Sequence, residues 1–191
     1  LMFSGDAING GFTRYTDVPG IPELKRAVME KFHKENNLKY TIDEVFVSNG
    51  GKQVLYLLFR CICNAGDEVL LPTPCYVSYA DQIRLSGGVP VFVPTSEERG
   101  FQLRASDLHP FLNERTKVLV LNSPNNPTGA VCSEDDLREI AALAKERDLF
   151  VVTDEVYEHL VFDDFEFWTI AQVEPALYDR TLTMNGVSKA Y

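Results

Sequence analysis

Lys189 is the residue of this sequence with the most reactive side chain in the most unusual place. It follows a short β-branched segment at 181–184, within the run from Asn185 to Tyr191. An ammonium group is strongly hydrated and costly to bury at the end of a strand, and burial lowers the pKa of a lysine, so that its amine attacks carbonyl groups. The position favours Schiff-base chemistry, with an ordinary surface lysine as the alternative.

Asp154 follows a second apolar segment, at 149–153, and Tyr157 comes shortly after it. A carboxylate at the end of a buried strand is costly to desolvate unless a cation or a hydrogen-bond donor meets it. This predicts such a partner for Asp154, with an N-cap of the following helix as the structural alternative. A nucleotide-hydrolase acid is excluded, because the phosphate-loop string G-x-x-x-x-G-K-[ST] is absent from the sequence.

A candidate anion site lies in the turn Gly50-Gly51-Lys52, after a predicted strand at 45–48 and before an apolar helix. Glycines let the backbone approach an anion closely, and the free N–H groups of the helix's first turn point toward it. Lys52 adds a full positive charge. The turn therefore suits a phosphate group, and a tight strand-to-helix turn is the structural alternative.

Asn126 lies in a loop from Asn122 to Gly129 that follows another apolar segment. Pro124 and Pro127 fix their own backbone angles and restrict the residues before them, and Gly129 permits a positive φ. We expect a stiff loop that holds the Asn126 amide in one direction, with a simple polar turn as the alternative.

The elements that must position these residues alternate along the chain. Apolar or β-branched runs predict strands at 45–48, 68–71, 89–93, 117–121, 149–153 and 181–184. Between them, helical spacing predicts helices that begin at Pro22 and after the N-cap Ser133, and a helix buried within the domain at 54–62. The alternation predicts an α/β fold with a mainly parallel sheet sandwiched by helices, whose strands end at one edge.

Composition limits the classes of function. The chain has 191 residues, of which 45% are hydrophobic and 24% charged, and its net charge is −10. Nucleic acid repels a domain this acidic. No apolar stretch approaches the ~18 residues of a membrane span, and the first residues lack the regions of a signal peptide. We therefore expect a cytoplasmic protein.

The cysteines predict packing rather than metal binding. Cys61, Cys63, Cys75 and Cys132 form no C-x-x-C pair and no cluster with histidine, so no metal site is expected. In a protein without an export signal they are expected to be reduced thiols. Cys61 and Cys63 lie in an apolar run, and we predict that both pack in the core.

The four strand-end groups have a common use. They offer an anion-binding turn, an oriented amide, a buried acid near a phenol, and an imine-forming lysine. Pyridoxal 5′-phosphate requires an anchor for its phosphate, a carboxylate for its pyridinium nitrogen and a lysine for its aldehyde. The sequence thus predicts a pyridoxal-phosphate site at the carboxyl edge of the sheet.

The motifs also resemble those of a known family. The runs Ser123–Gly129, Asp154–Glu158 and Ser188–Tyr191, in this order, together with Tyr15 and Pro19–Leu24, are similar to class I aminotransferases of pyridoxal-phosphate fold type I, particularly the aspartate-aminotransferase-like branch. The resemblance runs over the whole chain. It implies the large cofactor domain of an enzyme that moves an amino group from an L-amino acid to a 2-oxo acid.

The resemblance implies a role for each candidate residue. Lys189 would bind the cofactor's aldehyde as a Schiff base and shuttle the proton between Cα and C4′, and Asp154 would keep the ring nitrogen protonated. Asn126 and Tyr157 would hydrogen-bond the phenolic oxygen of the ring. The turn Gly50-Gly51-Lys52 would hold the phosphate.

Further contacts are implied in the same way. Tyr76 would stack on the ring, with core filler as the alternative, and Ser188 is a weaker candidate for the phosphate through its hydroxyl or backbone. Many relatives have a phosphate-binding serine where this chain has Gly186, so no contact is assigned there. Tyr15 would reach the cofactor phosphate of the neighbouring subunit, which implies a homodimer with a shared active site.

The resemblance also implies a domain division. Residues 1–15 would be part of an N-terminal arm, and residues 16–191 the large domain without the C-terminal small domain. The arginines with which the family binds the phosphate and the substrate carboxylate would lie outside this range. The alternatives are a β-lyase or synthase on the same scaffold and, from another class, a non-catalytic aminotransferase-like regulatory domain.

Overall fold

The computed structural model describes residues 2–190, with side chains described from residue 5 to residue 189. By its internal contacts the chain divides into two compact units, residues 1–48 and residues 49–191. Among the described residues, no helix has the length and apolar character needed to cross a membrane.

The first unit is helical. It contains α1 (Met2–Asn9), α2 (Pro22–Asn36) and the 3-10 helix η1 (Ile42–Glu44). The predicted start of α2 at Pro22 is confirmed, and Asn37, in the left-handed conformation with φ 53°, ends the helix. Phe32 of α2 packs edge-to-face on Tyr40, with ring centroids 5.4 Å apart.

The strand predicted at 45–48 is wrong. Val45 is extended, with φ −105° and ψ 126°, but the segment belongs to no sheet. Its backbone instead makes a hydrogen bond from Val47 N to Pro19 O, 2.9 Å long. A Cβ on Gly20, whose φ is +101°, would lie 2.7 Å from Val47 Cβ, so this approach requires glycine. β-Branched residues suit an extended backbone, but a strand also needs a neighbouring ladder.

The second unit is built on a five-stranded sheet in the order β2-β1-β3-β4-β5, in which every neighbouring pair is parallel. The strands are β1 (Glu68–Thr73), β2 (Val89–Pro94), β3 (Thr116–Asn122), β4 (Phe150–Asp154) and β5 (Thr181–Met184). Five of the six predicted strands are therefore confirmed, as is the mainly parallel α/β fold.

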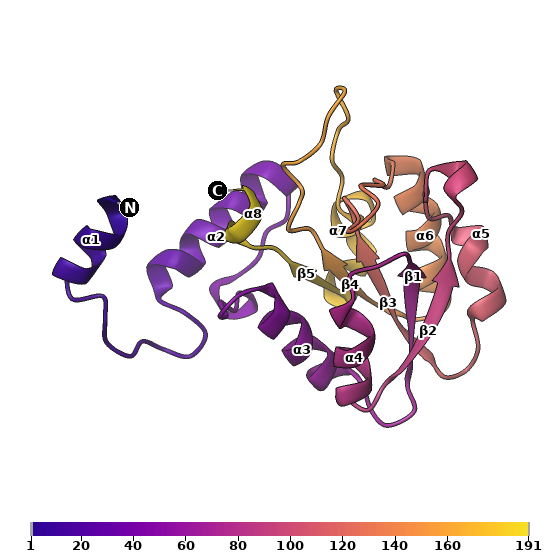
Figure 1. Cartoon of the computed structure of the whole chain (residues 1–191), viewed down its shortest axis with the longest axis horizontal. Coiled ribbons are helices and arrows are strands. Elements are labelled where there is room, and N and C mark those ends of the chain that lie inside the picture. Colours follow the sequence, from indigo (N-terminus) through magenta and orange to yellow (C-terminus); the bar gives the residue numbers. More distant parts are fainter. Residues whose placement is uncertain (1, 191) are drawn as a thin grey trace. The chain divides into compact units, whose positions relative to one another are not determined.

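Helices cover both faces of this sheet. Figure 1 shows α3 and α4 on one face, and α5, α6 and α7 on the other. The helices are α3 (Gly51–Ile62), α4 (Ser78–Leu85), α5 (Ala105–Leu108), α6 (Glu134–Glu146), α7 (Ile170–Val173) and α8 (Val187–Ala190), with 3-10 helices η2 (Glu97–Arg99), η3 (His109–Phe111) and η4 (Pro175–Arg180).

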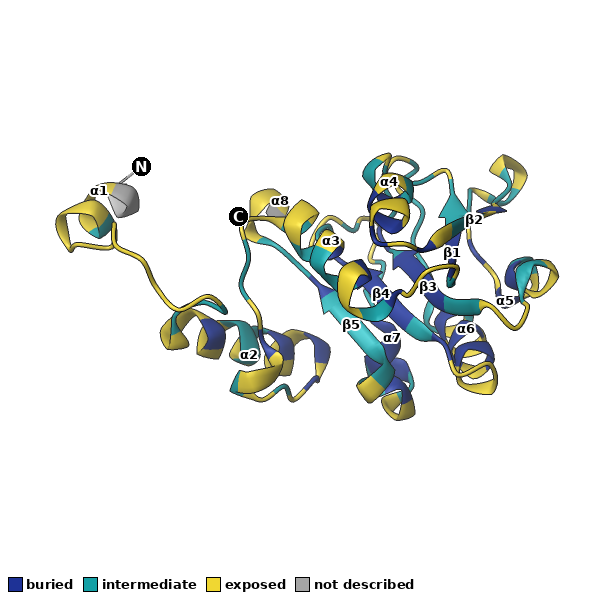
Figure 2. Ribbon diagram, turned by 90° about the horizontal axis from the view of Figure 1, so that it is seen from below, coloured by how far each residue is buried: buried dark blue, intermediate teal, exposed yellow. Residues whose placement is uncertain are grey.

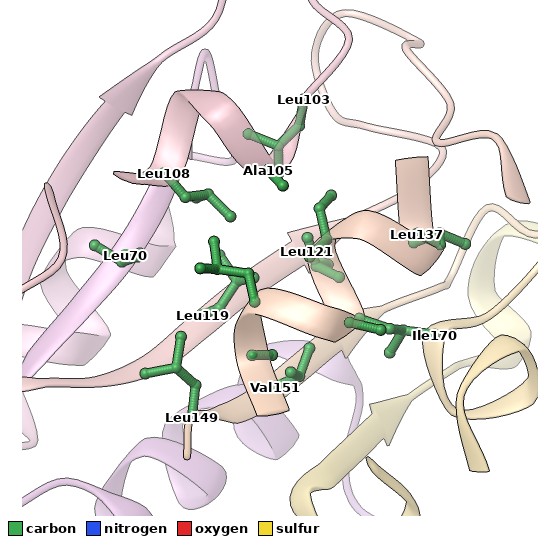
Figure 3. Packing of buried hydrophobic residues seen from close by; sticks show 14 of the residues in the cluster. Leu70, Leu103, Ala105, Leu108, Leu119, Leu121, Leu137, Leu149, Val151 and Ile170 are labelled. Atoms are coloured by element: carbon green, nitrogen blue, oxygen red, sulfur yellow. The ribbon is translucent and has the colours of Figure 1, made fainter. Parts of the chain in front are cut away.

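The core forms two layers because successive strand residues point to opposite faces. On β3, Val118 and Val120 pack with residues of α3 and α4, whereas Leu119 and Leu121 pack with residues of α5, α6 and α7. Figure 3 shows the second layer around Leu119, and Figure 2 shows the buried strands between the helices. Burial on both faces explains the continuously apolar strands.

The helix predicted at 54–62 is less buried than expected. Leu55 and Phe59 of α3 are in the core, but Tyr56 and Cys61 are exposed. Cys63 is buried, so the packing role predicted for the two cysteines is confirmed for Cys63 and wrong for Cys61. Two residues along an α-helix turn the side chain by roughly 200°, which carries Cys61 away from the face that holds Phe59. All four cysteines are free thiols.

We predict that Ser133→Ala lowers the free energy of unfolding by about 1 kcal/mol. The Ser133 hydroxyl accepts a hydrogen bond from Asp136 N at 3.1 Å, and the Asp136 carboxylate accepts one from Ser133 N at 3.3 Å, so the predicted cap of α6 is confirmed. Ser96→Ala is the matched control, because Ser96 precedes η2 without a side-chain cap bond. Urea denaturation checks the difference, and equal losses in the two variants would refute the capping role.

Candidate active site

The carboxyl ends of three adjacent strands carry the centre of the site. In the strand register, Asn122 at the end of β3 pairs with Asp154 at the end of β4, and Asp154 pairs with Met184 at the end of β5. A Cβ built on Gly51, the first residue of α3, would lie 3.2 Å from Met184 Cε. The sheet therefore brings the start of α3 close to the strand end beside Asp154.

Asp154 is a buried carboxylate with an identified donor. Its side chain is 5% exposed, and Oδ2 accepts a hydrogen bond from the Tyr79 hydroxyl at 2.6 Å. Oδ1 accepts a longer bond, 3.4 Å, from Val156 N. Burial raises the pKa of Asp154, and the bonds from Tyr79 and Val156 lower it. The predicted donor partner is therefore present, and it is a tyrosine.

The loop after β3 is held by its own side chains. Asn122 donates from Nδ2 to the carbonyl of Asp154 at 2.8 Å, and its Oδ1 accepts from Asn126 N at 2.7 Å. Asn125 donates from Nδ2 to Thr128 Oγ1 at 2.8 Å and to Pro74 O at 3.1 Å. These bonds tie the Asn126 backbone to β4 and the loop to the end of β1, as a stiff loop requires.

The turn before α3 has the properties of an anion site. Gly50 adopts φ +90°, and no side chain caps the first turn of the helix. Its first N–H groups are therefore open to an anion, and the helix dipole adds a favourable field. Gln82 of α4 fixes the turn by donating from Nε2 to Lys52 O at 2.7 Å. The Lys52 side chain is exposed and its Nζ lies 5.8 Å from the centroid of the Tyr76 ring.

The aromatic residues of the site lie after β1 and β4. Tyr76 is half-buried and packs edge-to-face on Tyr79, with ring centroids 5.5 Å apart. Hydrogen bonds from Ser78 and Lys52 lower the pKa of Tyr76. Tyr157 is half-buried in the turn after β4. Burial, followed by the neighbouring Asp154 carboxylate, raises the pKa of Tyr79.

Lys189 and Ser188 lie on α8, just beyond β5, and their side chains are exposed. The turn that leads to α8 is anchored by Asn185, which donates from Nδ2 to Glu158 Oε1 at 2.6 Å and accepts from Gly186 N at 2.7 Å. A Cβ on Gly186 would meet Val156 Cγ2 at 3.5 Å, an ordinary contact. Tyr15 is fully exposed in the first unit.

Asn122, Asp154 and Met184 are neighbours at the strand ends, and Gly51 approaches Met184 there. A separate cavity of about 30 Å³ lies beside Tyr79 and Asn122, lined mainly by β1, β3 and the segments 101–103 and 130–132. Its volume suits one or two water molecules.

Sequence reasoning missed the residues that hold the candidate residues in place through hydrogen bonds. Tyr79, Asn122, Asn185 and Gln82 contact candidate residues or the turns that carry them. Asn122 had a signal in the sequence, because it is the last strand residue before the loop. Tyr79 had only its helical spacing from Tyr76, which does not distinguish a hydrogen-bonding tyrosine from a packing one.

We predict that Asp154→Asn stabilises the cofactor-free protein at pH 7. The folded state holds the Asp154 proton more tightly than the unfolded chain does, so the ionised form destabilises the fold above the usual carboxyl pKa of ~3.9. The increase in the free energy of unfolding caused by Asp154→Asn should therefore become smaller as the pH falls toward that value. Urea midpoints at several pH values measure it, with the exposed Asp179→Asn as control. A gain that does not change with pH would contradict the account.

The chain is similar to known proteins along its whole length. The family model described as aminotransferase class I and II matches residues 6–191. A curated aspartate/prephenate aminotransferase from Cereibacter sphaeroides is 52% identical over 186 residues, which are 97% of this chain and 46% of that protein. The probable aspartate/prephenate aminotransferase of Rhizobium leguminosarum bv. phaseoli is 49% identical, and the match covers 97% of this chain and 47% of that protein.

Solved structures agree with the fold. The aromatic aminotransferase from Pyrococcus horikoshii OT3 gives a TM-score of 0.97 at 40% identity, covering 100% of this chain and 51% of that one. The aspartate aminotransferase from Rhizobium meliloti gives a TM-score of 0.95 at 44% identity, and the match covers 100% of this chain and 48% of that one. The chain thus spans about half the length of the relatives it matches. On the fold and on the match over residues 6–191, it belongs to the aminotransferase class I and II family.

Proposed function

We propose that these residues form the cofactor-binding part of a pyridoxal-phosphate-dependent aminotransferase, which moves an amino group from an L-amino acid to a 2-oxo acid. The observation that carries the proposal is the buried Asp154 carboxylate beside the strand end that contacts the uncapped start of α3. This edge therefore offers an acid for a basic ring nitrogen close to donors for a phosphate.

The residues present fit this cofactor. The positive φ of Gly50 and the free space around a Cβ there leave the backbone open to a phosphate. The N–H groups at Gly51 and Lys52 would bind its oxygens, with Ser188 as a weaker contact. The burial of Asp154 excludes water from its carboxylate, which strengthens its attraction for a protonated nitrogen.

The remaining contacts follow from the same edge. Tyr76 would present its ring to the face of the cofactor, and its edge-to-face contact with Tyr79 supports that orientation. Asn126 and Tyr157 would donate to the phenolic oxygen, and the bond from Asn126 N to Asn122 orients the first of them. Bound pyridoxal phosphate supplies an aldehyde for the amino group and a ring that withdraws electrons.

Lys189 is the proposed catalytic residue. Its amine would hold the cofactor covalently through the aldehyde until the amino substrate displaces it. The freed amine would then take the proton from the substrate Cα and return it at C4′. The Asn185–Glu158 hydrogen bond supports this role, because it anchors the turn from which α8 begins.

The substrates and the assembly are part of the proposal. Relatives named aspartate/prephenate aminotransferase favour aspartate as amino donor, with prephenate or another 2-oxo acid as acceptor. We also propose a homodimer in which Tyr15 reaches the phosphate of the neighbouring subunit, and its complete exposure in the first unit leaves it free to do so. Residues 16–191 would belong to the cofactor domain, and the four free thiols suit the reducing cytoplasm.

We predict that Lys189→Ala abolishes the visible absorbance of the lysine-bound cofactor. Borohydride reduction of the wild-type protein should attach the cofactor to the peptide that contains Lys189, and mass spectrometry identifies that peptide. Lys34→Ala, which removes an exposed lysine of α2, should leave the absorbance and the labelled peptide unchanged. An unaltered spectrum in Lys189→Ala would overturn the assignment.

We predict that the complete polypeptide transfers the amino group of aspartate to 2-oxoglutarate. Ping-pong kinetics are expected, because the amino group stays on the enzyme between two substrates. A coupled assay for oxaloacetate measures the transfer. Release of pyruvate and ammonia from an S-substituted cysteine, whose thiol leaves from Cβ, without an amino acceptor would instead favour a β-lyase. Cofactor binding without turnover of any amino acid would favour a regulatory domain.

A further inference from the structure

We propose that Tyr79 is a positioning residue of the cofactor site: its hydroxyl fixes one carboxylate oxygen of Asp154 while its ring supports Tyr76. A single buried side chain would then orient both the acid and the aromatic face that the cofactor's ring meets. The inference rests on the proposed function, since the group that Asp154 and Tyr76 face is the pyridine ring.

The first support is the burial of the pair. Tyr79 is 1% exposed, lies on α4 and packs in the apolar layer with Leu71, Ile83 and Val120. Its hydroxyl donates to Asp154 Oδ2 at 2.6 Å, a length typical of a bond to an ionised oxygen. A phenylalanine would fill the same space without a polar group to satisfy. The Tyr79 hydroxyl therefore contributes through its hydrogen bond to the Asp154 carboxylate.

The second support is that the two carboxylate oxygens of Asp154 differ in their hydrogen bonding. Tyr79 donates to Oδ2, whereas the bond to Oδ1 found among the described residues is the 3.4 Å bond from Val156 N. The weakly bonded Oδ1 is the oxygen left to accept a strong bond from a protonated ring nitrogen. The bond from Tyr79 also favours the ionised carboxylate and so opposes the effect of burial on the pKa of Asp154.

The third support is the contact of the two aromatic rings. Tyr76 meets Tyr79 at an interplanar angle of 82°, which limits the tilt of the Tyr76 ring. Tyr76 in turn lies near the ammonium of Lys52, at the start of α3. Tyr79 thus stands in a continuous series of contacts that runs from the acid at the end of β4 to the proposed phosphate turn.

The test is the affinity of cofactor-free protein, as the complete polypeptide, for two ligands. One is pyridoxal phosphate, and the other is its 1-deaza analogue, in which a C–H group replaces the ring nitrogen. In Tyr79→Phe we expect a loss of affinity for pyridoxal phosphate of roughly tenfold or more, because a hydrogen bond to a charged group is lost. The affinity for the deaza analogue should stay unchanged, since that ligand makes no bond to Asp154.

Each outcome separates the inference from the function on which it rests. Failure of the wild-type protein to bind pyridoxal phosphate would refute the proposed function itself. Wild-type binding with equal losses for the two ligands in Tyr79→Phe would make Tyr79 a packing residue, and no loss for either would also overturn the inference. Tyr56→Phe, which removes a hydroxyl from a tyrosine 37% exposed on α3, is the matched control and should bind both ligands normally.

A second variant keeps the test decisive if Tyr79→Phe does not fold. Tyr79→Phe/Asp154→Asn removes the buried charge together with its donor, so it should fold and bind the deaza analogue like the wild type. In a double-mutant cycle the two substitutions should be strongly non-additive for pyridoxal phosphate. Additive losses, or a double variant that also fails to fold, would contradict a role exerted through Asp154.

Discussion

A carboxylate buried at the end of a parallel strand is the constraint on which this site depends. Asp154 is costly to bury when ionised, and among the described residues the Tyr79 hydroxyl and, through a longer bond, Val156 N donate to it. Within the described part of the chain, Oδ1 retains capacity for a further hydrogen bond. In the proposed function, a protonated ring nitrogen would bond to Oδ1, the less occupied oxygen, and the stability of this strand end would then depend on binding of a basic ring.

The parallel sheet explains why these polar residues lie at one edge. Because β3, β4 and β5 run in one direction, their last residues meet at one edge, and the crossover connections place the starts of helices there as well. Residues far apart in the sequence thereby become neighbours, as Tyr79 and Asp154 do. The apolar layers on both faces fix the strands, so the edge can carry polar groups that contribute little to the core.

Much of this architecture was predictable from the sequence. The continuously apolar strands and the Ser133 cap report on local structure, and the strand-end residues Asp154 and Lys189 are recognisable by their type and place. The rest depends on tertiary contacts. Val45–Ser48 has strand composition but no ladder to join, and Cys61 turns away from the core with its helix. Tyr79 is chemically informative only once its hydroxyl is known to reach Asp154 at the end of β4.

The most direct measurement of the central claim is the ¹⁵N NMR shift of pyridoxal phosphate labelled at its ring nitrogen and bound to the complete polypeptide. If Asp154 acts as described, the shift is that of a protonated, hydrogen-bonded pyridinium in the wild-type protein, and it moves to that of a neutral pyridine in Asp154→Asn. A neutral-pyridine shift in the wild-type protein, identical to that of the variant, would contradict the account.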